Sequence, residues 1–220
     1  MSFDAPVFVQ DESGSYTTEI GMGGENGDKF ATWLSEQAAA GIWSTTIDYD
    51  ISNELFTSGN TPYIVAGPWV LDTFRDAGVE NLKVSEVPSA GGSPAGPFVG
   101  VQGFYLSSQS KNALLATNFL VDYLGSEDTQ RAFYEADPRI PAMTSLADEL
   151  KGDPITGGFV KSASIGVPMP SIPEMGEVWD LWNAAQVQIM EGADPVSTWN
   201  KMVSDLEVRC VKDFGQCLSF

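Results

Sequence analysis

The chain has 220 residues, of which 43% are hydrophobic and 19% are charged, a composition typical of a globular protein and not of a disordered one. Its net charge of −19, with no cluster of Lys and Arg to offset it, excludes nucleic acid and anionic membrane surfaces as partners. The absence of histidine removes the commonest general base, the usual partner of a catalytic serine or cysteine, and the commonest zinc ligand.

Signals for export, for membrane insertion and for a disulfide indicate where in the cell the protein acts. Residues 1–4 lack the basic start and apolar core of a signal peptide, so we expect either a cytosolic protein or a chain whose natural beginning has been removed. Apolar runs of about 18 residues are absent, so no membrane-spanning helix is predicted. Cys210 and Cys217 can form a disulfide if the last helix ends near Asp213 and the chain folds back at Gly215; two free thiols are the alternative.

The first quarter of the chain is predicted to form a hairpin and two helices, over 6–18, 28–40 and 51–57. The hairpin turns at 11–14, and Trp33 lies on the apolar face of the longer helix, where it is expected to be core. Asp50 is the expected N-cap of the shorter helix. Tyr49 is then a loop aromatic, and exposed loop rings are more often functional than structural.

Residues 56–69 are predicted to form a helix end, a buried strand and a sharp turn. Gly59 suits a left-handed helix cap, the apolar run 63–66 suits a strand covered on both faces, and Pro68 suits the first turn of a new helix. Trp69 then lies where the carboxyl end of a strand meets the amino end of a helix, which is where open α/β sheets bind ligands. The alternative is that Trp69 fills the core.

Beyond Trp69 the pattern predicts two strands and seven helices. The strands are expected at 81–87 and 98–106, and the helices after Trp69 to about 77, from 110 to 125, from 126 toward 138, before 150, from 153 to near 166, over 174–191, and from 194 toward 210. The Gly/Pro/Ser-rich stretch 88–97 is typical of a crossing between substructures. Three prolines predict an extended surface loop over 167–173.

Four side chains are candidates for one binding site: Tyr49, Trp69, Met169 in the proline-stiffened loop, and Trp179 in the first turns of the helix that follows this loop. Flat aromatic rings suit a sugar, because the apolar C–H face of a pyranose stacks on an indole. By analogy with aromatic pairs, such a stack is worth about 0.5–1.5 kcal/mol. For each side chain taken singly, a place in the core is the alternative.

Motifs for chemistry are sparse. A glycosidase needs two carboxylates about 5–9 Å apart, and among 30 acidic residues no pair stands out. Asp48, Asp50 and Glu54, which flank Tyr49, either accept sugar hydroxyls or solvate a loop. The sequence has no phosphate loop, nucleophile elbow or metal-ligand spacing, so we expect no cofactor and no metal.

Five short blocks occur in a fixed order: Asp48-Tyr49-Asp50-Ile51, Phe56-Thr57-Ser58-Gly59, Gly67-Pro68-Trp69, Pro97-Phe98-Val99-Gly100-Val101 and Met169-Pro170-Ser171-Ile172-Pro173-Glu174-Met175. In order and spacing, from about Val7 to Leu206, the chain resembles the maltose/maltodextrin-binding proteins of ABC importers, without their N-terminal part. The resemblance implies an α/β fold of the periplasmic-binding-protein-like (type II) class, mostly one lobe plus a remnant of the other. It assigns 1–97 and 153–220 to the second lobe and 98–152 to the late segment of the first.

The resemblance also implies roles for single residues. Tyr49, Trp69, Met169 and Trp179 match positions that line the sugar cleft of the family, with the two indoles as stacking platforms. Asp180 departs from the pattern, because the best-known members have a tyrosine there, which leaves the identity of the sugar open. Whether Trp182 compensates is open too.

The expected function is therefore a fragment of an exported, non-enzymatic solute-binding protein, periplasmic or anchored at the cell surface. It captures maltose- or maltodextrin-like oligosaccharides and passes them to the membrane permease of an ABC importer. Because one wall of the cleft is missing, we expect the fragment itself to bind sugar weakly or not at all. The alternatives are a glycan-acting hydrolase with paired carboxylates and a carbohydrate-binding module without a transport role.

Overall fold

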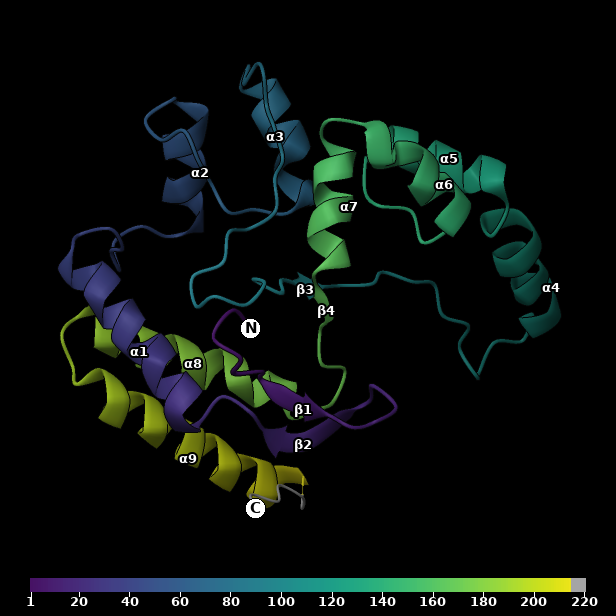
Figure 1. Cartoon of the computed structure of the whole chain (residues 1–220). Helices are drawn as coiled ribbons and strands as arrows, with labels where there is room; N and C mark the ends of the chain where they lie inside the picture. The colour runs from purple at the N-terminus through teal and green to yellow at the C-terminus, as the bar shows by residue number, and fades with distance from the viewer. Residues whose placement is uncertain (215–220) are drawn as a thin grey trace. The chain divides into compact units, whose positions relative to one another are not determined.

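The computed structural model describes residues 1–214, and the side chains of residues 1–210. The chain divides into two compact units, which we call the first and the second unit. The first unit consists of Met1–Ser52, Pro88–Gly96 and the chain from Pro168 onward; the second consists of Asn53–Val87 and Pro97–Val167. Figure 1 labels the elements of both units.

The first unit begins with the predicted hairpin, which is confirmed. Strand β1 (Phe8–Gln10) pairs antiparallel with β2 (Tyr16–Ile20), with Phe8 opposite Ile20. The carboxylate of Asp11 closes the turn, because its Oδ1 accepts hydrogen bonds from the backbone N–H groups of Ser13 and Ser15, at 2.8 and 3.0 Å. Together with a bond from the Ser13 hydroxyl, these bonds hold the pKa of Asp11 below its ordinary value.

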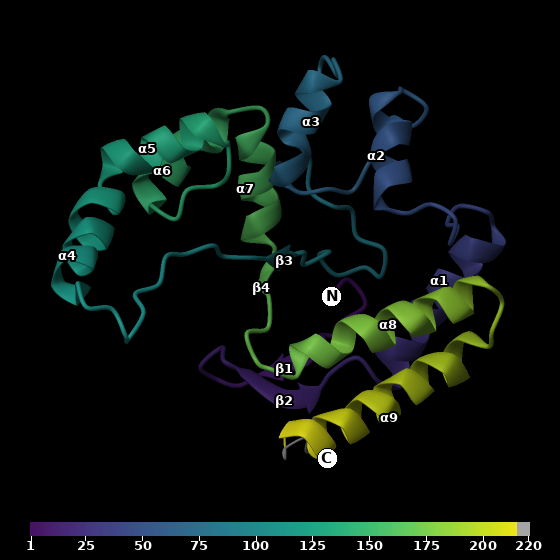
Figure 2. The same ribbon diagram turned by 180° about the vertical axis from the view of Figure 1, so that it is seen from behind.

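The core of the first unit lies among three long helices that pack side by side, as both views show (Figures 1 and 2): α1 (Gly24–Ala39), α8 (Met175–Met190) and α9 (Pro195–Phe214). Leu34, Val178 and Leu206 are fully buried between them. Trp199 on α9 is 1% exposed, and its Nε1 donates a hydrogen bond of 2.8 Å to the backbone oxygen of Met22. This bond ties the last helix to the segment that leads into α1.

An aromatic cluster surrounds Trp199. Neighbouring ring centroids lie between 4.9 and 6.2 Å apart in a group formed by Phe3, Phe30, Trp33, Trp43, Trp182 and Trp199. Trp33 is half-buried here, in line with its expected core position. Helix α1 starts four residues earlier than predicted, because its first turn is glycine-rich and polar and therefore carries no apolar periodicity.

The second unit consists mainly of short helices. They are α2 (Tyr49–Thr57, which starts in the first unit), the 3₁₀ turn η1 (Pro68–Val70), α3 (Leu71–Asp76), α4 (Ala113–Asn118), the π-helical turn η2 (Phe119–Leu124), α5 (Glu127–Ala136), α6 (Thr144–Glu149), the 3₁₀ turn η3 (Leu150–Gly152) and α7 (Thr156–Ser164). Strand β3 (Phe98–Val99) pairs with β4 (Val167–Pro168), where Val167 N–H donates to the Pro97 oxygen at 3.0 Å.

Several helices in this unit are capped by residues at their ends, among them Gly59, which was predicted as a cap. Gly59 and Gly78 adopt φ values of 75° and 77°, the left-handed conformation expected after α2 and α3. Ser126 accepts a hydrogen bond from the Thr129 N–H at the start of α5. Asp153 accepts bonds from the N–H groups of Ile155 and Thr156 before α7, at 2.9 and 2.6 Å.

The strand predictions in this unit were largely wrong. Residues 63–66 and 81–87 form no strand, and of the predicted strand 98–106 only Phe98–Val99 is formed. A strand needs a hydrogen-bonded neighbour, and in the described residues the sheets consist of β1 with β2 and of β3 with β4. Segment 81–87 instead packs on α7, so closely that a Cβ at Gly158 would lie 2.3 Å from the Val84 oxygen.

The disulfide prediction is left open. Cys210 is buried on α9, and Cys217 lies outside the described residues. Among the helices that are described, none combines the length and apolarity required to cross a bilayer.

Candidate functional site

Trp69 lies in η1, directly after the Gly67-Pro68 pair. The strand expected to precede it is absent, and Tyr63 and Val65 are 86% and 80% exposed. The predicted start of a helix at Pro68 is confirmed, and Val70 and Leu71 anchor this turn in the core. The Trp69 side chain is 58% exposed, so it does not fill the core.

Tyr49 is the first residue of α2 and is 57% exposed. It was predicted in the loop, with Asp50 as the N-cap of the helix. The structure shows instead that Asp48 is the cap, because its Oδ1 accepts a hydrogen bond of 2.9 Å from the N–H of Ile51. The helix therefore starts two residues earlier than predicted, and the phenol ring is carried by a helical backbone.

Met169 lies between two anchored residues and is 46% exposed. The hydroxyl of Tyr16, on the hairpin, donates a hydrogen bond of 2.5 Å to the backbone oxygen of Pro168. On the other side, Pro170 is buried. The predicted extended loop is present except where Val167–Pro168 forms β4, and these contacts hold the thioether at a fixed place on the first unit.

Trp179 lies near the start of α8 and is 51% exposed. Its neighbour Val178 is fully buried, so the backbone of this turn is fixed while the indole faces outward. Trp182, one turn later, is part of the aromatic cluster, at 5.3 Å from Trp199, and its Nε1 donates to Gln186 Oε1 at 3.1 Å. Trp182 is therefore a structural residue of the first unit.

Asp180, which follows Trp179 in the sequence, is exposed, and Glu177 on the same helix pairs with Arg209 on α9. Arg209 Nη1 lies 2.9 Å from Glu177 Oε2, and the pKa of Arg209 is raised, first by this bond and further by the charge of Asp180. At the position where the resemblance leads us to expect a tyrosine, the surface of the first unit thus carries a carboxylate.

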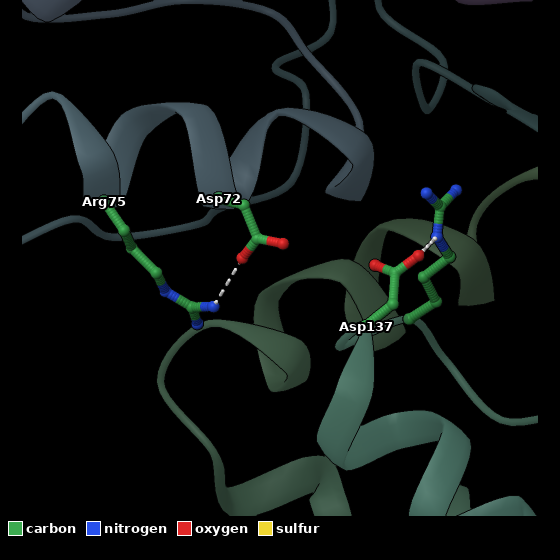
Figure 3. Close-up of polar contacts among 4 residues, drawn as sticks. Asp72, Arg75 and Asp137 are labelled. Atoms are coloured by element: carbon green, nitrogen blue, oxygen red, sulfur yellow. Dashed lines mark hydrogen bonds and ion pairs between the residues drawn. The ribbon is translucent and has the colours of Figure 1, made fainter.

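The carboxylate nearest Trp69 in sequence, that of Asp72, is paired with an arginine. Asp72 Oδ1 lies 3.2 Å from Arg75 Nη1 on α3, and elsewhere in the same unit Asp137 Oδ2 lies 2.6 Å from Arg139 Nε (Figure 3). The described residues contain no group of three or more Cys, Asp or Glu side chains arranged to hold a metal ion. Asp72 and Asp137 are thus each engaged in an exposed ion pair.

The candidate residues are distributed over both units. Tyr49, Met169 and Trp179 belong to the first unit and Trp69 to the second. Sequence reasoning missed Gly67 as a determinant: a Cβ there would lie 2.1 Å from the Trp69 ring. The available signal in the sequence was a glycine two residues before a tryptophan.

The family model for bacterial extracellular solute-binding proteins matches residues 2–157. A galactooligosaccharide-binding protein of Bacillus subtilis (strain 168) is 29% identical over 198 residues, which cover 86% of this chain and 47% of that protein. A maltodextrin-binding protein of the same strain is 29% identical over 180 residues, which cover 78% of this chain and 42% of that protein.

A solved structure of a cyclo/maltodextrin-binding protein complexed with maltotetraose superposes on this chain with a TM-score of 0.85 and 31% sequence identity. The match covers 95% of this chain and 55% of that protein's chain. This likeness confirms the predicted α/β fold of the periplasmic-binding-protein-like class (type II). The chain spans about half the length of the relatives it matches.

Proposed function

Since the chain belongs to the family of bacterial extracellular solute-binding proteins, we propose that it forms part of a protein that captures maltose- or maltodextrin-like oligosaccharides for uptake by an ABC transporter. The observation that carries this proposal is the match of 0.85 in TM-score to a binding protein solved with maltotetraose, together with the name of a maltodextrin-binding relative. Both of these similar proteins are binders of malto-oligosaccharides by name, and neither is named as an enzyme.

Tyr49, Trp69, Met169 and Trp179 are the proposed sugar contacts, with the two indoles stacking on pyranose faces. Each of the four side chains is between 46% and 58% exposed, while its backbone is anchored by a cap, a buried neighbour or a hydrogen bond. Side chains held in place before the ligand arrives lose little conformational entropy on binding. This combination of exposure and anchoring supports a ligand role over a core role.

The lobe assignment is also part of the proposal. Residues 1–97 and 153–220 contribute to one lobe and 98–152 to the other. This division differs from that into compact units, in which Asn53–Val87 and residues 153–167 are grouped with 98–152. Sugar contacts from both lobes shift an open–closed equilibrium. The protein acts outside the cytoplasm, in the periplasm or anchored at the cell surface, and delivers its sugar to a membrane permease. The family's description as extracellular supports this location.

A galacto-oligosaccharide is the second candidate ligand. A relative that covers 86% of this chain is named for binding such sugars, and Asp180 follows the proposed platform Trp179 in the sequence. A carboxylate accepts hydrogen bonds from hydroxyls, and its placement favours some hydroxyl orientations over others. Sugar selectivity is therefore expected to depend on Asp180.

Calorimetric titration of the full-length gene product tests the proposal. Maltotetraose and a galacto-oligosaccharide of similar length are compared with cellotetraose, and turnover of a chromogenic maltoside is followed in parallel. Binding of maltotetraose without turnover supports the proposal. If the galacto-oligosaccharide binds more tightly than maltotetraose, the second candidate ligand is favoured. Turnover favours the hydrolase alternative, and absence of binding to every sugar refutes capture of oligosaccharides.

A further inference from the structure

The methionines of the chain differ in how far they are exposed to solvent. All seven have described side chains. Three are buried, at 5% exposure or less: Met22, Met175 and Met202. Three more are half-buried: Met1, Met143 and Met190. Met169 is the remaining one, and its side chain is exposed. Because the oxidation of a thioether requires direct contact with the oxidant, Met169 is the methionine expected to react first.

The backbone around Met169 keeps the sulfur accessible. Met169 precedes a proline, so an extended conformation of its own backbone is favoured. Pro168 is held in strand β4, and its carbonyl oxygen accepts the hydrogen bond from the Tyr16 hydroxyl. On the other side, Pro170 is buried. A rotation of this short segment that buried the thioether would therefore break the Tyr16 bond or expose Pro170.

We propose that Met169 is a site of reversible oxidation. A peroxide converts its thioether to a sulfoxide, which weakens the capture of oligosaccharide, and a methionine sulfoxide reductase restores it. This inference rests on the proposed function, in which Met169 is a sugar contact, and adds to that function a regulation by the redox state of one side chain. The proposed location outside the cytoplasm, where conditions are oxidising, favours this chemistry.

The oxidation balances with hydrogen peroxide as the co-reactant. A lone pair of the Met169 sulfur attacks one peroxide oxygen, so that the S–O bond forms while the O–O bond breaks. The hydroxide that leaves takes the proton of the transferred oxygen and departs as water. The sulfur loses two electrons and the peroxide gains them. In the reverse reaction, the reductase removes the oxygen as water while two thiols of the reductant become a disulfide.

A sulfoxide changes what the site offers to a sugar. The thioether is apolar and suits contact with the C–H face of a pyranose, whereas the sulfoxide is polar and chiral. Its oxygen accepts hydrogen bonds from water, and the apolar face of a sugar that covers it removes these partners, which costs binding free energy. Because the segment is held by the Tyr16 bond and by the buried Pro170, the new oxygen remains in the proposed site. The oxidised protein is therefore expected to bind sugar more weakly.

The test oxidises the full-length gene product with hydrogen peroxide under native conditions. Peptide mass spectrometry follows the gain of one oxygen at each methionine, and calorimetry with maltotetraose gives the affinity. We expect Met169 to react at least about tenfold faster than the buried Met175, and bound maltotetraose to slow this reaction. Protein oxidised at Met169 should bind at least about fivefold more weakly, and treatment with a methionine sulfoxide reductase and a thiol should restore the affinity.

Two variants separate Met169 from the other methionines, and each is compared with its own untreated sample. Met169→Leu removes the oxidisable sulfur, so treatment with peroxide should not change the affinity of this variant. Met190→Leu removes the half-buried sulfur at the end of α8, outside the proposed site. The affinity of this control should fall on oxidation as that of the wild type does.

The outcomes separate this inference from the proposed function. If the untreated protein binds no sugar, the proposed function fails and the inference fails with it. If the untreated protein binds sugar, but Met169 reacts no faster than Met175 or its oxidation leaves the affinity unchanged, the inference alone is overturned. An equal loss of affinity in Met169→Leu and Met190→Leu also overturns it, because another residue is then responsible.

Discussion

The six-membered ring of Trp69 lies directly over Gly67. A Cβ at Gly67 would be 2.1 Å from Cζ3 and 2.3 Å from Cη2 of the indole, so no side chain fits between the backbone and this ring. Gly67 has a φ of −109°, which any residue can adopt, so the requirement for glycine here comes from the ring and not from the backbone. The pair thus fixes where the exposed indole lies.

Gly67→Ala is expected to displace the Trp69 ring and to weaken oligosaccharide binding by the full-length gene product about tenfold, or about 1.4 kcal/mol. The fold should persist, because the ring can turn outward into solvent. Calorimetry measures the affinity and thermal denaturation the stability. Gly152→Ala is the control, since a Cβ at Gly152 meets nothing within 4 Å. Equal affinities of the two variants would show that the ring's placement does not matter for binding.

Asp153 is expected to stabilise the second unit through the start of α7. Its pKa lies below the ordinary value of 3.8, first because the backbone N–H of Thr156 donates to the carboxylate. Asp153→Ala should cost about 0.5–1 kcal/mol, the lower part of the range for N-caps, because solvent screens this largely exposed group. Urea denaturation at neutral pH measures the loss.

The pH dependence of this effect has a definite sign. A depressed pKa in the folded state means that the stabilisation is present above the unfolded value of 3.8 and is lost as pH falls through the lower folded-state value. The difference between wild type and Asp153→Ala should therefore shrink below that pH. Asp148→Ala, which removes an exposed ion pair with Lys151, is the control and should change stability little at any pH.

Trp199→Phe is expected to destabilise the first unit by about 1–3 kcal/mol, because the buried carbonyl of Met22 loses its hydrogen-bond donor. Trp43→Phe is the comparison. The Trp43 indole is 39% exposed, so this substitution should change stability by less than about 0.5 kcal/mol. Chemical denaturation of both variants gives the two free energies. If they are equal, the Trp199–Met22 bond has no special part in stability.

Helix positions could be predicted because their signals are local. Cap residues such as Ser126, Asp153 and Asp194 act within three or four residues of themselves, and each accepts a backbone N–H in the structure. Where two residues could serve as the cap, the predicted helix start was wrong by a few residues. For α2, Asp48 is the cap and not the predicted Asp50. Local chemistry was thus sufficient for where most helices begin and end.

Strand positions could not be predicted in the same way, because a strand depends on a neighbour that the sequence pattern does not name. The run Tyr63–Ala66 has the composition of a buried strand, yet Tyr63 is 86% exposed. Likewise, the apolar periodicity of residues 113–124 predicted the helix correctly but not what covers it. For the candidate site, exposure of Tyr49, Trp69, Met169 and Trp179 is established, and their convergence on one sugar is still a prediction.

The chain of 220 residues by itself is expected to bind maltodextrin weakly or not at all. It spans 42% of the maltodextrin-binding relative and 55% of the cyclo/maltodextrin-binding protein, and capture in a cleft between two lobes needs contacts from both. Calorimetry with maltotetraose on this chain, next to the full-length gene product, checks the expectation. Micromolar affinity of the chain alone would mean that its own residues form a sufficient site.

The account depends most on Trp69 as a stacking platform for a sugar. Calorimetric titration of the full-length gene product with maltotetraose should show that Trp69→Ala weakens binding by more than about tenfold, which corresponds to about 1.4 kcal/mol. Trp43→Ala is the control, because this indole is also exposed but lies outside the proposed site; its affinity should equal that of the wild type. Unchanged affinity of Trp69→Ala would contradict the sugar-stacking role and with it the proposed site.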